Sequence, residues 1–331
     1  MTVELAPTPK DTVFREGTAR LYRFRRPDSA SADETRTPVL VVPSLINRWY
    51  ILDLCPDHSV VEALNRHFDT WLFDWGVPRD EDRYLSWERV LQKLARAVRR
   101  VRRETGASQV TLLGYSLGAT LSGIYSAVHP EHIAGLVNLA GPFDFKKSGL
   151  LTDLTDPRWF DVKAITDAGN LSPVQMHVGL MALQPTLPAI KLVSYLEQAN
   201  DEATKQAFDA REAWLKDHTP FPASAYRTYI EEFYQNNNLI RGEHFALGQR
   251  VDLSKITCPV LSILPDRDKT CPADAARGLN EHVSSTDNEV LMIHGDHVGA
   301  VVGRKAQRDL YPKLLGWLRA RVCGARLSAV Q

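Results

Sequence analysis

Ser116 lies between two glycines, Gly114 and Gly118, in the spacing Gly-x-Ser-x-Gly. Residues 110–113 before it are apolar and β-branched, as in a buried strand, and the apolar residues after it recur at helical spacing. Between a strand and a helix, this spacing is typical of a nucleophile elbow, a strained turn that exposes the serine hydroxyl. We therefore expect Ser116 to be a nucleophile, with the backbone N–H of Leu117 directed at the developing oxyanion.

A serine hydroxyl becomes a good nucleophile when a histidine accepts its proton and a carboxylate orients that histidine. The expected chain order is Ser, Asp, His, each in a loop after a strand. Asp268 follows the apolar run 258–264, and His297 follows the run 289–293. The sequence therefore predicts that Ser116, Asp268 and His297 form a catalytic triad.

Each partner of the serine has a rival close by. Asp266 is the alternative acid, but Asp268 lies further into its loop, just before the segment that ends at Pro272. His294 is the alternative base, but it stands at the end of a strand, where it could face the core. We prefer Asp268 and His297, and the rivals remain open at this point.

A second oxyanion donor is expected in the loop 43–48, which follows the apolar strand 38–42. In the fold that the motif implies, this loop normally supplies a backbone N–H to the oxyanion. Leu45 or Ile46 would be the donor, and because the role belongs to the backbone, the sequence does not choose between them.

The elements around these residues alternate between strand and helix, which indicates a mostly parallel sheet flanked by helices. We expect an α/β class chain with the α/β-hydrolase fold and a final helix over 304–321. Residues 1–36 form an N-terminal segment, with a turn at 27–36, and residues 37–145 and 250–322 form the core. Residues 146–249 form a helical cap inserted after the sixth strand, with an apolar cluster of Trp159, Met176, Met181, Trp214 and Phe221.

Composition restricts the possible partners. The 331 residues contain 40 Lys plus Arg and 40 Asp plus Glu, so the net charge is zero and a nucleic-acid partner is not expected. Arginines crowd the helix 86–105, but its amphipathic pattern favours a solvated face over a phosphate site. No stretch is apolar enough to span a membrane. The four cysteines lack a metal-ligand spacing, so we expect a cytoplasmic protein with free thiols, no metal and no cofactor.

Several strings resemble the catalytic subunit of polyhydroxyalkanoate synthases, particularly of the short, two-subunit type. The resemblance covers about residues 37 to 320 and rests on 44–53, 73–78, 233–242, 251–260 and 296–299. In that family the acid precedes a loop ending in proline and the base precedes Val or Ile and then Gly, which matches Asp268 and His297. The resemblance implies an α/β-hydrolase core and an acyl-binding architecture.

This chain departs from that family at positions in and beside the expected catalytic residues. The family nucleophile is a cysteine in G-x-C-x-G-G, where this chain has Ser116, with Leu117 in place of the usual glutamine and Ala119 in place of the second glycine. Lys269 stands where a histidine usually follows the acid. The resemblance therefore implies the fold more strongly than it implies polymerisation.

Because an acyl-serine is an oxyester, water is a favourable acceptor for its acyl group. We therefore expect a serine acyl hydrolase, an esterase or thioesterase, acting on hydroxyacyl esters, oligoesters or acyl thioesters. The alternative is an acyltransferase or a polyhydroxyalkanoate synthase-like enzyme that uses acyl-CoA or acyl-carrier donors. A non-catalytic protein that binds polyester or a synthase would not need the Ser, Asp, His order. A homodimer and a small partner subunit are both left open.

Overall fold

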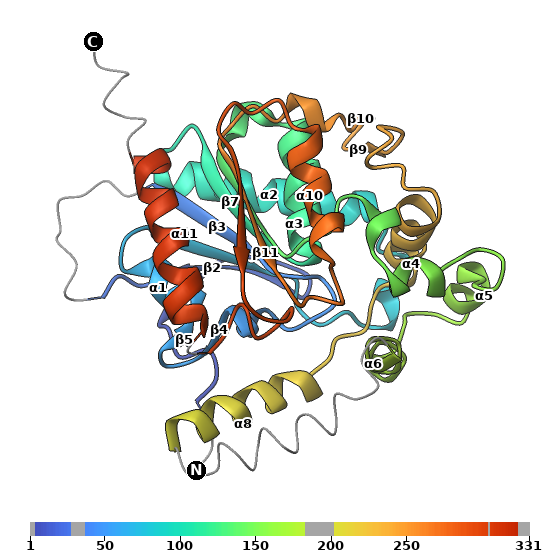
Figure 1. The fold of residues 1–331 in the computed structure, drawn as a ribbon, viewed down its shortest axis with the longest axis horizontal. Helices are drawn as coiled ribbons and strands as arrows, with labels where there is room; N and C mark the ends of the chain where they lie inside the picture. Colours follow the sequence, from blue (N-terminus) through green and yellow to red (C-terminus); the bar gives the residue numbers. More distant parts are fainter. Residues whose placement is uncertain (1–3, 28–36, 183–201, 304, 324–331) are drawn as a thin grey trace.

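A sheet of eight strands, in the order β1-β2-β6-β3-β7-β8-β11-β12, forms the centre of the computed structural model (Figure 1). The structure describes residues 4–27, 37–182, 202–303 and 305–323. Six neighbouring strands of this sheet run parallel, namely β6, β3, β7, β8, β11 and β12. Strands β1 and β2 pair antiparallel at one edge of the sheet. Their bounds are β1 Lys10–Glu16, β2 Ala19–Phe24, β3 Pro38–Val42, β6 Asp69–Asp74, β7 Val110–Tyr115, β8 Ile133–Leu139, β11 Val260–Pro265 and β12 Asn288–Ile293.

Helices cover both faces of this sheet, because its inner strands are apolar on both sides. In β3, Leu40 and Val42 join the core cluster formed with α2 and α3, whereas Val39 and Val41 join the cluster formed with α1 and α11. The flanking helices are α1 Val60–Asn65, α2 Trp87–Thr105, α3 Leu117–Val128, α10 Ala273–His282 and α11 Tyr311–Leu318. The expected mostly parallel α/β architecture is confirmed.

Local interactions explain where the arginine-rich helix α2 begins and ends. The Ser86 hydroxyl accepts the backbone N–H of Arg89 at its start, and Gly106 ends it in the left-handed conformation. Arg96 pairs with Glu16 of β1, and Arg100 pairs with Glu104 one turn further along the helix. As expected, these arginines belong to a polar helix face with acidic partners nearby.

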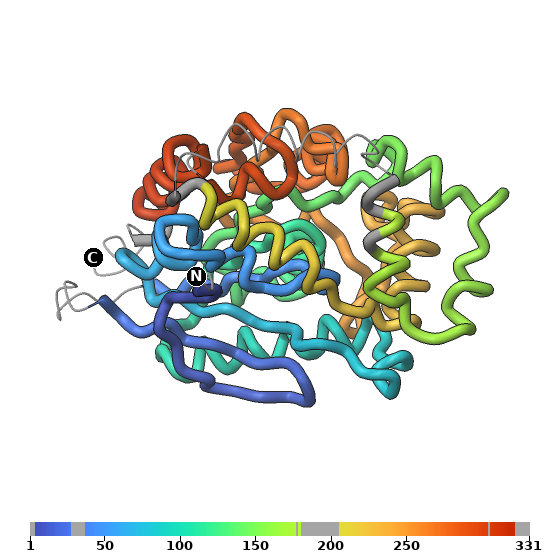
Figure 2. The backbone as a smooth tube through the Cα atoms, turned by 90° about the horizontal axis from the view of Figure 1, so that it is seen from below, coloured from blue at the N-terminus to red at the C-terminus, as the bar shows by residue number. Residues whose placement is uncertain are grey.

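A long segment between β8 and β11 contains helices that extend beyond one side of the sheet (Figure 2). Two distant parts of it pair, since Leu171 and Phe221 form an antiparallel bridge. Helix α8 joins it to the core, because Trp214 donates to the carbonyl of Arg48 (2.8 Å). Its elements are α4 Leu150–Leu154, α5 Val162–Asp167, α6 Pro173–Ala182, α8 Glu202–Lys216, α9 Ala223–Thr228 and the π-helix η5 Tyr229–Gln235.

Short elements complete the chain. The two-stranded pairs are β4 Asp53–Cys55 with β5 His58–Ser59, and β9 Phe245–Ala246 with β10 Gln249–Arg250. The 3-10 turns are η1 Trp49–Leu52, η2 Asp80–Tyr84, η3 Pro130–His132, η4 Phe145–Lys147 and η6 Leu253–Lys255. None of the helices in the described ranges combines the length and the apolar character needed to cross a bilayer.

One expectation requires correction. Trp159 does not belong to an apolar cluster, because 61% of it is exposed, although Trp214 and Phe221 are buried. The expected final helix is present, and in it the π-helices η7 Ala306–Leu310 and η8 Arg319–Cys323 flank α11. Pro312 at the start of α11 has no N–H to donate to the preceding turn, which accounts for the change at η7. Residue 304, most of the turn 27–36 and the side chain of Met181 lie outside the described part.

Candidate active site

Ser116 occupies the turn between β7 and α3 in a strained backbone conformation. Its φ is 54° and its ψ is −129°, a region that residues other than glycine seldom adopt. Hydrogen bonds on both sides hold the turn: the Ser116 N–H donates to the carbonyl of Leu139 in β8, and its carbonyl accepts the N–H of Ala119, both at 2.9 Å. The structure therefore has the elbow that the sequence predicts.

The two glycines of the motif allow the backbone to pack tightly at this turn. A Cβ on Gly114 would collide with the backbone of Ala119, and one on Gly118 would collide with the carbonyls of Val42 and Pro43. The close approach of Gly118 sets the start of α3 against the loop that follows β3. Only glycine fits at either position without a backbone shift.

That loop contains both candidates for the second oxyanion donor. Leu45 is buried, and Ile46 is half-buried with its N–H directed at the Ser44 hydroxyl at 3.5 Å. The indole of Trp75 donates to the carbonyl of Pro43 (2.9 Å) and fixes the loop. At the start of α3, the N–H of Leu117 lies in the first turn, where helix N–H groups have no intrahelical acceptor.

The structure brings Asp268 and His297 together at the ends of neighbouring strands β11 and β12. His297 Nδ1 lies 2.6 Å from Asp268 Oδ2. The other carboxylate oxygen of Asp268 accepts the backbone N–H groups of Thr270 and Cys271, both at 2.8 Å. The carboxylate is fully buried and the imidazole is 13% exposed, so the pair faces little water.

The rival residues form a separate pair at the surface. His294 Nδ1 lies 2.8 Å from Asp266 Oδ2, and both side chains are about two-fifths exposed, at 41% and 42%. The expectation that His294 could face the core is therefore wrong. The Gly295 N–H and His294 hold the pKa of the Asp266 carboxyl below its usual value, as in an ordinary surface ion pair.

Tyr115 connects the serine turn to the histidine loop. Its hydroxyl donates to the backbone carbonyl of His297 at 3.1 Å, and the two rings stack with centroids 5.3 Å apart. Burial holds the pKa of this phenol well above its usual value, so the hydroxyl remains a neutral donor. Because Ser116 is the next residue, this contact places the serine turn beside the loop of His297.

The electrostatics of His297 result from opposing influences. Burial alone would lower the pKa of the imidazole, but the charge and hydrogen bond of Asp268, together with the charge of Asp296, raise it above the usual value of about 6.5. Asp296 also fixes the loop, because its Oδ1 accepts the N–H groups of Val298 (3.1 Å) and Gly299 (2.6 Å).

A buried amide behind the elbow was missed by sequence reasoning. Asn138, near the end of β8, accepts the N–H of Gly141 at 2.8 Å and donates toward the Ser262 hydroxyl. A side chain on Gly141 would collide with Ala119 and with the carbonyl of Ser116. A polar residue within the apolar run 133–139 was the available signal for such a contact.

The chain is similar to known proteins along most of its length. Residues 37–303 match a family described as "alpha/beta hydrolase fold", and residues 1–64 match "Poly-beta-hydroxybutyrate polymerase (PhaC) N-terminus". The chain is 33% identical to "Poly(3-hydroxyalkanoate) polymerase subunit PhaC" of Allochromatium vinosum, over 96% of this chain and 90% of that protein. The chain belongs to the PhaC family.

A second PhaC relative, from Haloferax mediterranei, is also 33% identical over 96% of this chain, which spans 65% of the length of that relative. Solved structures support the fold alone. A hydrolase from Pseudomonas aeruginosa PA01 gives a TM-score of 0.59 at 14% identity and covers 93% of this chain and 98% of its own. An epoxide hydrolase from Bacillus megaterium gives a TM-score of 0.57 at 14% identity, and the match covers 91% of this chain and 97% of that one. The expected α/β-hydrolase fold and the PhaC resemblance are both confirmed.

Proposed function

We propose that this member of the PhaC family is an acyltransferase that takes a 3-hydroxyacyl group from a thioester donor and passes it to a hydroxyl acceptor through an acyl-Ser116 intermediate. The similarity to the polymerase subunits along 96% of the chain supports acyl transfer over the simple hydrolysis expected from the serine alone. The buried Asp268 and His297 pair beside the elbow supports the chemistry.

In this proposal each residue has a defined role. His297 Nε2 accepts the Ser116 proton as the serine oxygen bonds to the thioester carbonyl carbon. Collapse of the tetrahedral intermediate breaks the carbon–sulfur bond, and the proton passes from His297 to the leaving thiol. His297 then deprotonates the acceptor hydroxyl, whose oxygen bonds to the acyl carbon. The bond from that carbon to the Ser116 oxygen breaks, and His297 returns the proton to this oxygen. Asp268 holds Nδ1–H so that Nε2 is the basic atom throughout.

The oxyanion would be bound by two backbone N–H groups, that of Leu117 and one from the loop after β3. Leu45 is the better second donor, because the Ile46 N–H is directed at the Ser44 hydroxyl. Both elements are held together where Gly118 meets Val42 and Pro43, which is the rigid support that such a site requires.

A serine nucleophile gives hydrolysis a specific advantage, so an esterase or thioesterase is the second candidate. The family cysteine forms a thioester, from which transfer to an alcohol remains downhill. An acyl-serine is an oxyester, from which transfer to another hydroxyl is close to thermoneutral and transfer to water is favourable. Exclusion of water by the segment between β8 and β11 would then decide the product.

Product analysis distinguishes the two candidates. The purified chain is incubated with 3-hydroxybutyryl-CoA, with and without an added short hydroxybutyrate oligomer, and soluble and insoluble products are separated. We expect release of free CoA with elongated esters or insoluble polymer. Free 3-hydroxybutyrate as nearly the sole acyl product would instead support the hydrolase. Ser116→Ala is the control, and it should release no CoA above the uncatalysed rate.

We also infer a partner subunit, because both relatives are named as a "polymerase subunit". The mass of the chain in solution, measured by light scattering with and without lysate proteins from its source, tests this. A stable homodimer that is fully active alone would contradict the need for a second kind of subunit.

A further inference from the structure

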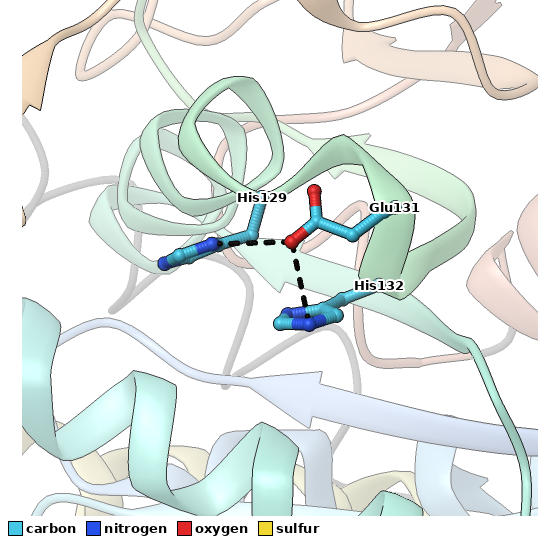
Figure 3. Close-up of side chains that lie close together, drawn as sticks. All are labelled: His129, Glu131 and His132. Atoms are coloured by element: carbon cyan, nitrogen blue, oxygen red, sulfur yellow. Dashed lines mark ion pairs between the residues drawn. The ribbon is translucent and has the colours of Figure 1, made fainter.

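Two histidines and a glutamate gather where α3 ends and β8 is about to begin (Figure 3). His129 ends α3, and Glu131 and His132 belong to the 3-10 turn η3 that follows. Pro130 between them restricts the backbone of this turn. The cluster therefore lies at the far end of α3 from Ser116, about 18 Å along a helix of this length.

The donor atoms of the three side chains converge. Glu131 Oε1 lies 3.4 Å from His129 Nδ1 and 3.3 Å from His132 Nε2. Each of the three residues offers a possible ligand atom within 4.8 Å of those of the other two. Zinc bound by nitrogen and oxygen at about 2.0 to 2.1 Å in a tetrahedron places its ligand atoms about 3.3 to 3.4 Å apart. The two distances from Glu131 Oε1 to the histidine nitrogens already have this length. Rotation of the partly exposed imidazole rings can bring the two nitrogens to the same distance from each other.

Tyr125 supports His132 in the manner of a second ligand shell. The Tyr125 hydroxyl lies 2.9 Å from His132 Nδ1, the ring nitrogen that faces away from the glutamate. The Tyr125 hydroxyl can accept a hydrogen bond from Nδ1–H of this imidazole, which favours the tautomer with the proton on Nδ1. With Nδ1 protonated, the lone pair is on Nε2, the atom that faces Glu131.

We propose that His129, Glu131 and His132 bind a Zn²⁺ ion through Nδ1, a carboxylate oxygen and Nε2, with the fourth position open to water or a partner. Two imidazoles and one carboxylate suit a borderline transition metal better than Mg²⁺ or Ca²⁺, which prefer oxygen ligands. The ion would fasten the end of α3 to the start of β8, and its role would be structural, since Ser116 is at the opposite end of α3. This proposal differs from the expectation that the chain has no metal site.

Neighbouring positive charges oppose the ion. The guanidinium groups of Arg102 and Arg99 both act electrostatically on the His132 imidazole, with Arg102 the stronger. The Arg102 guanidinium would therefore repel a bound cation. Replacing Arg102 by Gln should therefore tighten zinc binding. Zinc bound to histidines elsewhere on the surface would not respond to this change.

The test is a zinc titration of the full chain without a histidine tag, against a chromophoric chelator, together with thermal unfolding. We expect one strong Zn²⁺ equivalent and a higher Tm with Zn²⁺ but not with Mg²⁺. His132→Ala and Glu131→Gln should each weaken this binding, His132→Ala by at least about 100-fold, and Tyr125→Phe should weaken it about 10-fold.

Two controls exclude other sites. His294→Ala removes a similar exposed histidine and carboxylate pair and should leave the strong equivalent unchanged, and so should His297→Ala. The glutamate is exposed and its replacement should not affect folding, so Glu131→Gln keeps the test valid if a histidine variant misfolds. Equal zinc affinity in Glu131→Gln, His132→Ala and the unaltered chain, or loss of binding in His297→Ala alone, would overturn the proposal.

Discussion

The hydroxyl of Tyr115 donates a hydrogen bond of 3.1 Å to the backbone carbonyl of His297, across 182 positions of the chain. The Tyr115 side chain is buried, and its ring also stacks on the imidazole. The residue that precedes the proposed nucleophile thus holds the backbone and the ring of the proposed base. A change at Tyr115 should alter the approach of His297 to Ser116 without touching the substrate.

Tyr115→Phe removes the hydroxyl and keeps the ring. We expect kcat to fall about 10-fold with little change in KM, because small displacements of a base slow proton transfer more than they weaken binding. Steady-state kinetics with an activated ester measures this. Tyr22→Phe, which removes a buried hydroxyl that bonds to Asp74, is the matched control. A Tyr115→Phe enzyme with unchanged kcat would remove the positioning role.

The pH dependence should reflect the raised pKa of His297. The base must be neutral, so kcat/KM falls as the pH drops through this pKa, and a raised pKa puts the fall above about pH 6.5. Asp296→Asn keeps an oxygen to accept the N–H groups of Val298 and Gly299 but removes a charge that raises the pKa. The acidic limb should therefore move to lower pH.

Asp266→Asn is the matched control for this measurement, because Asp266 is exposed and pairs with His294. It should leave the acidic limb in place. A limb that moves in Asp266→Asn but not in Asp296→Asn would assign the base to His294.

Asp268→Asn should lower kcat by about 10³ to 10⁴-fold, since the buried carboxylate holds the imidazole tautomer.

Thiol reagents should leave the activity intact. Burial, aided by Asp57 and Asp53, raises the pKa of Cys55 to about 11, burial raises that of Cys258 to about 12, and burial raises that of Cys271 well above the usual range. These thiols are protonated at neutral pH and react slowly. Activity after iodoacetamide treatment at pH 7.5 tests this, with Ser116→Cys as the sensitive control. Rapid inactivation of the unaltered chain, prevented by substrate, would indicate a cysteine nucleophile.

Ser116→Cys should shift the products toward polymer. The thioester it forms retains the activation of the incoming donor, so transfer to a hydroxyl becomes downhill again. We expect the ratio of ester product to free hydroxy acid from 3-hydroxybutyryl-CoA to rise at least several-fold, even if turnover falls. An unchanged ratio would mean that exclusion of water, and not the nucleophile, determines the acceptor.

Local sequence patterns predicted the parts of the site that depend on neighbouring residues. The elbow follows from Gly114 and Gly118, and the Asp268 and His297 pair follows from their places after two adjacent parallel strands. The Tyr115 contact with His297 could not be predicted, because it depends on the relative placement of β7 and β12, which are not neighbours in the sheet. The π-helical turn η7 in the last helix depends on the single missing donor of Pro312.

The convergence of two histidines and a glutamate after α3 was also missed, although all three lie in one short stretch of sequence. His129, Glu131 and His132 stand within four residues, but whether such side chains converge depends on where a helix ends. Here the helix ends at His129, and the turn at Pro130 points the next two side chains back toward it. The exposure of Trp159 was also missed, because this residue lies in a turn between α4 and α5 and an aromatic residue is as apolar at the surface as in the core.

The central claim is that Ser116 is the covalent nucleophile. The most direct measurement is labelling of the active chain with a fluorophosphonate, followed by peptide mapping by mass spectrometry. We predict a single adduct on Ser116, formed in step with loss of activity, absent in Ser116→Ala and much slower in His297→Ala. An adduct on another residue, or complete labelling of Ser116 in protein that keeps its activity, would contradict it.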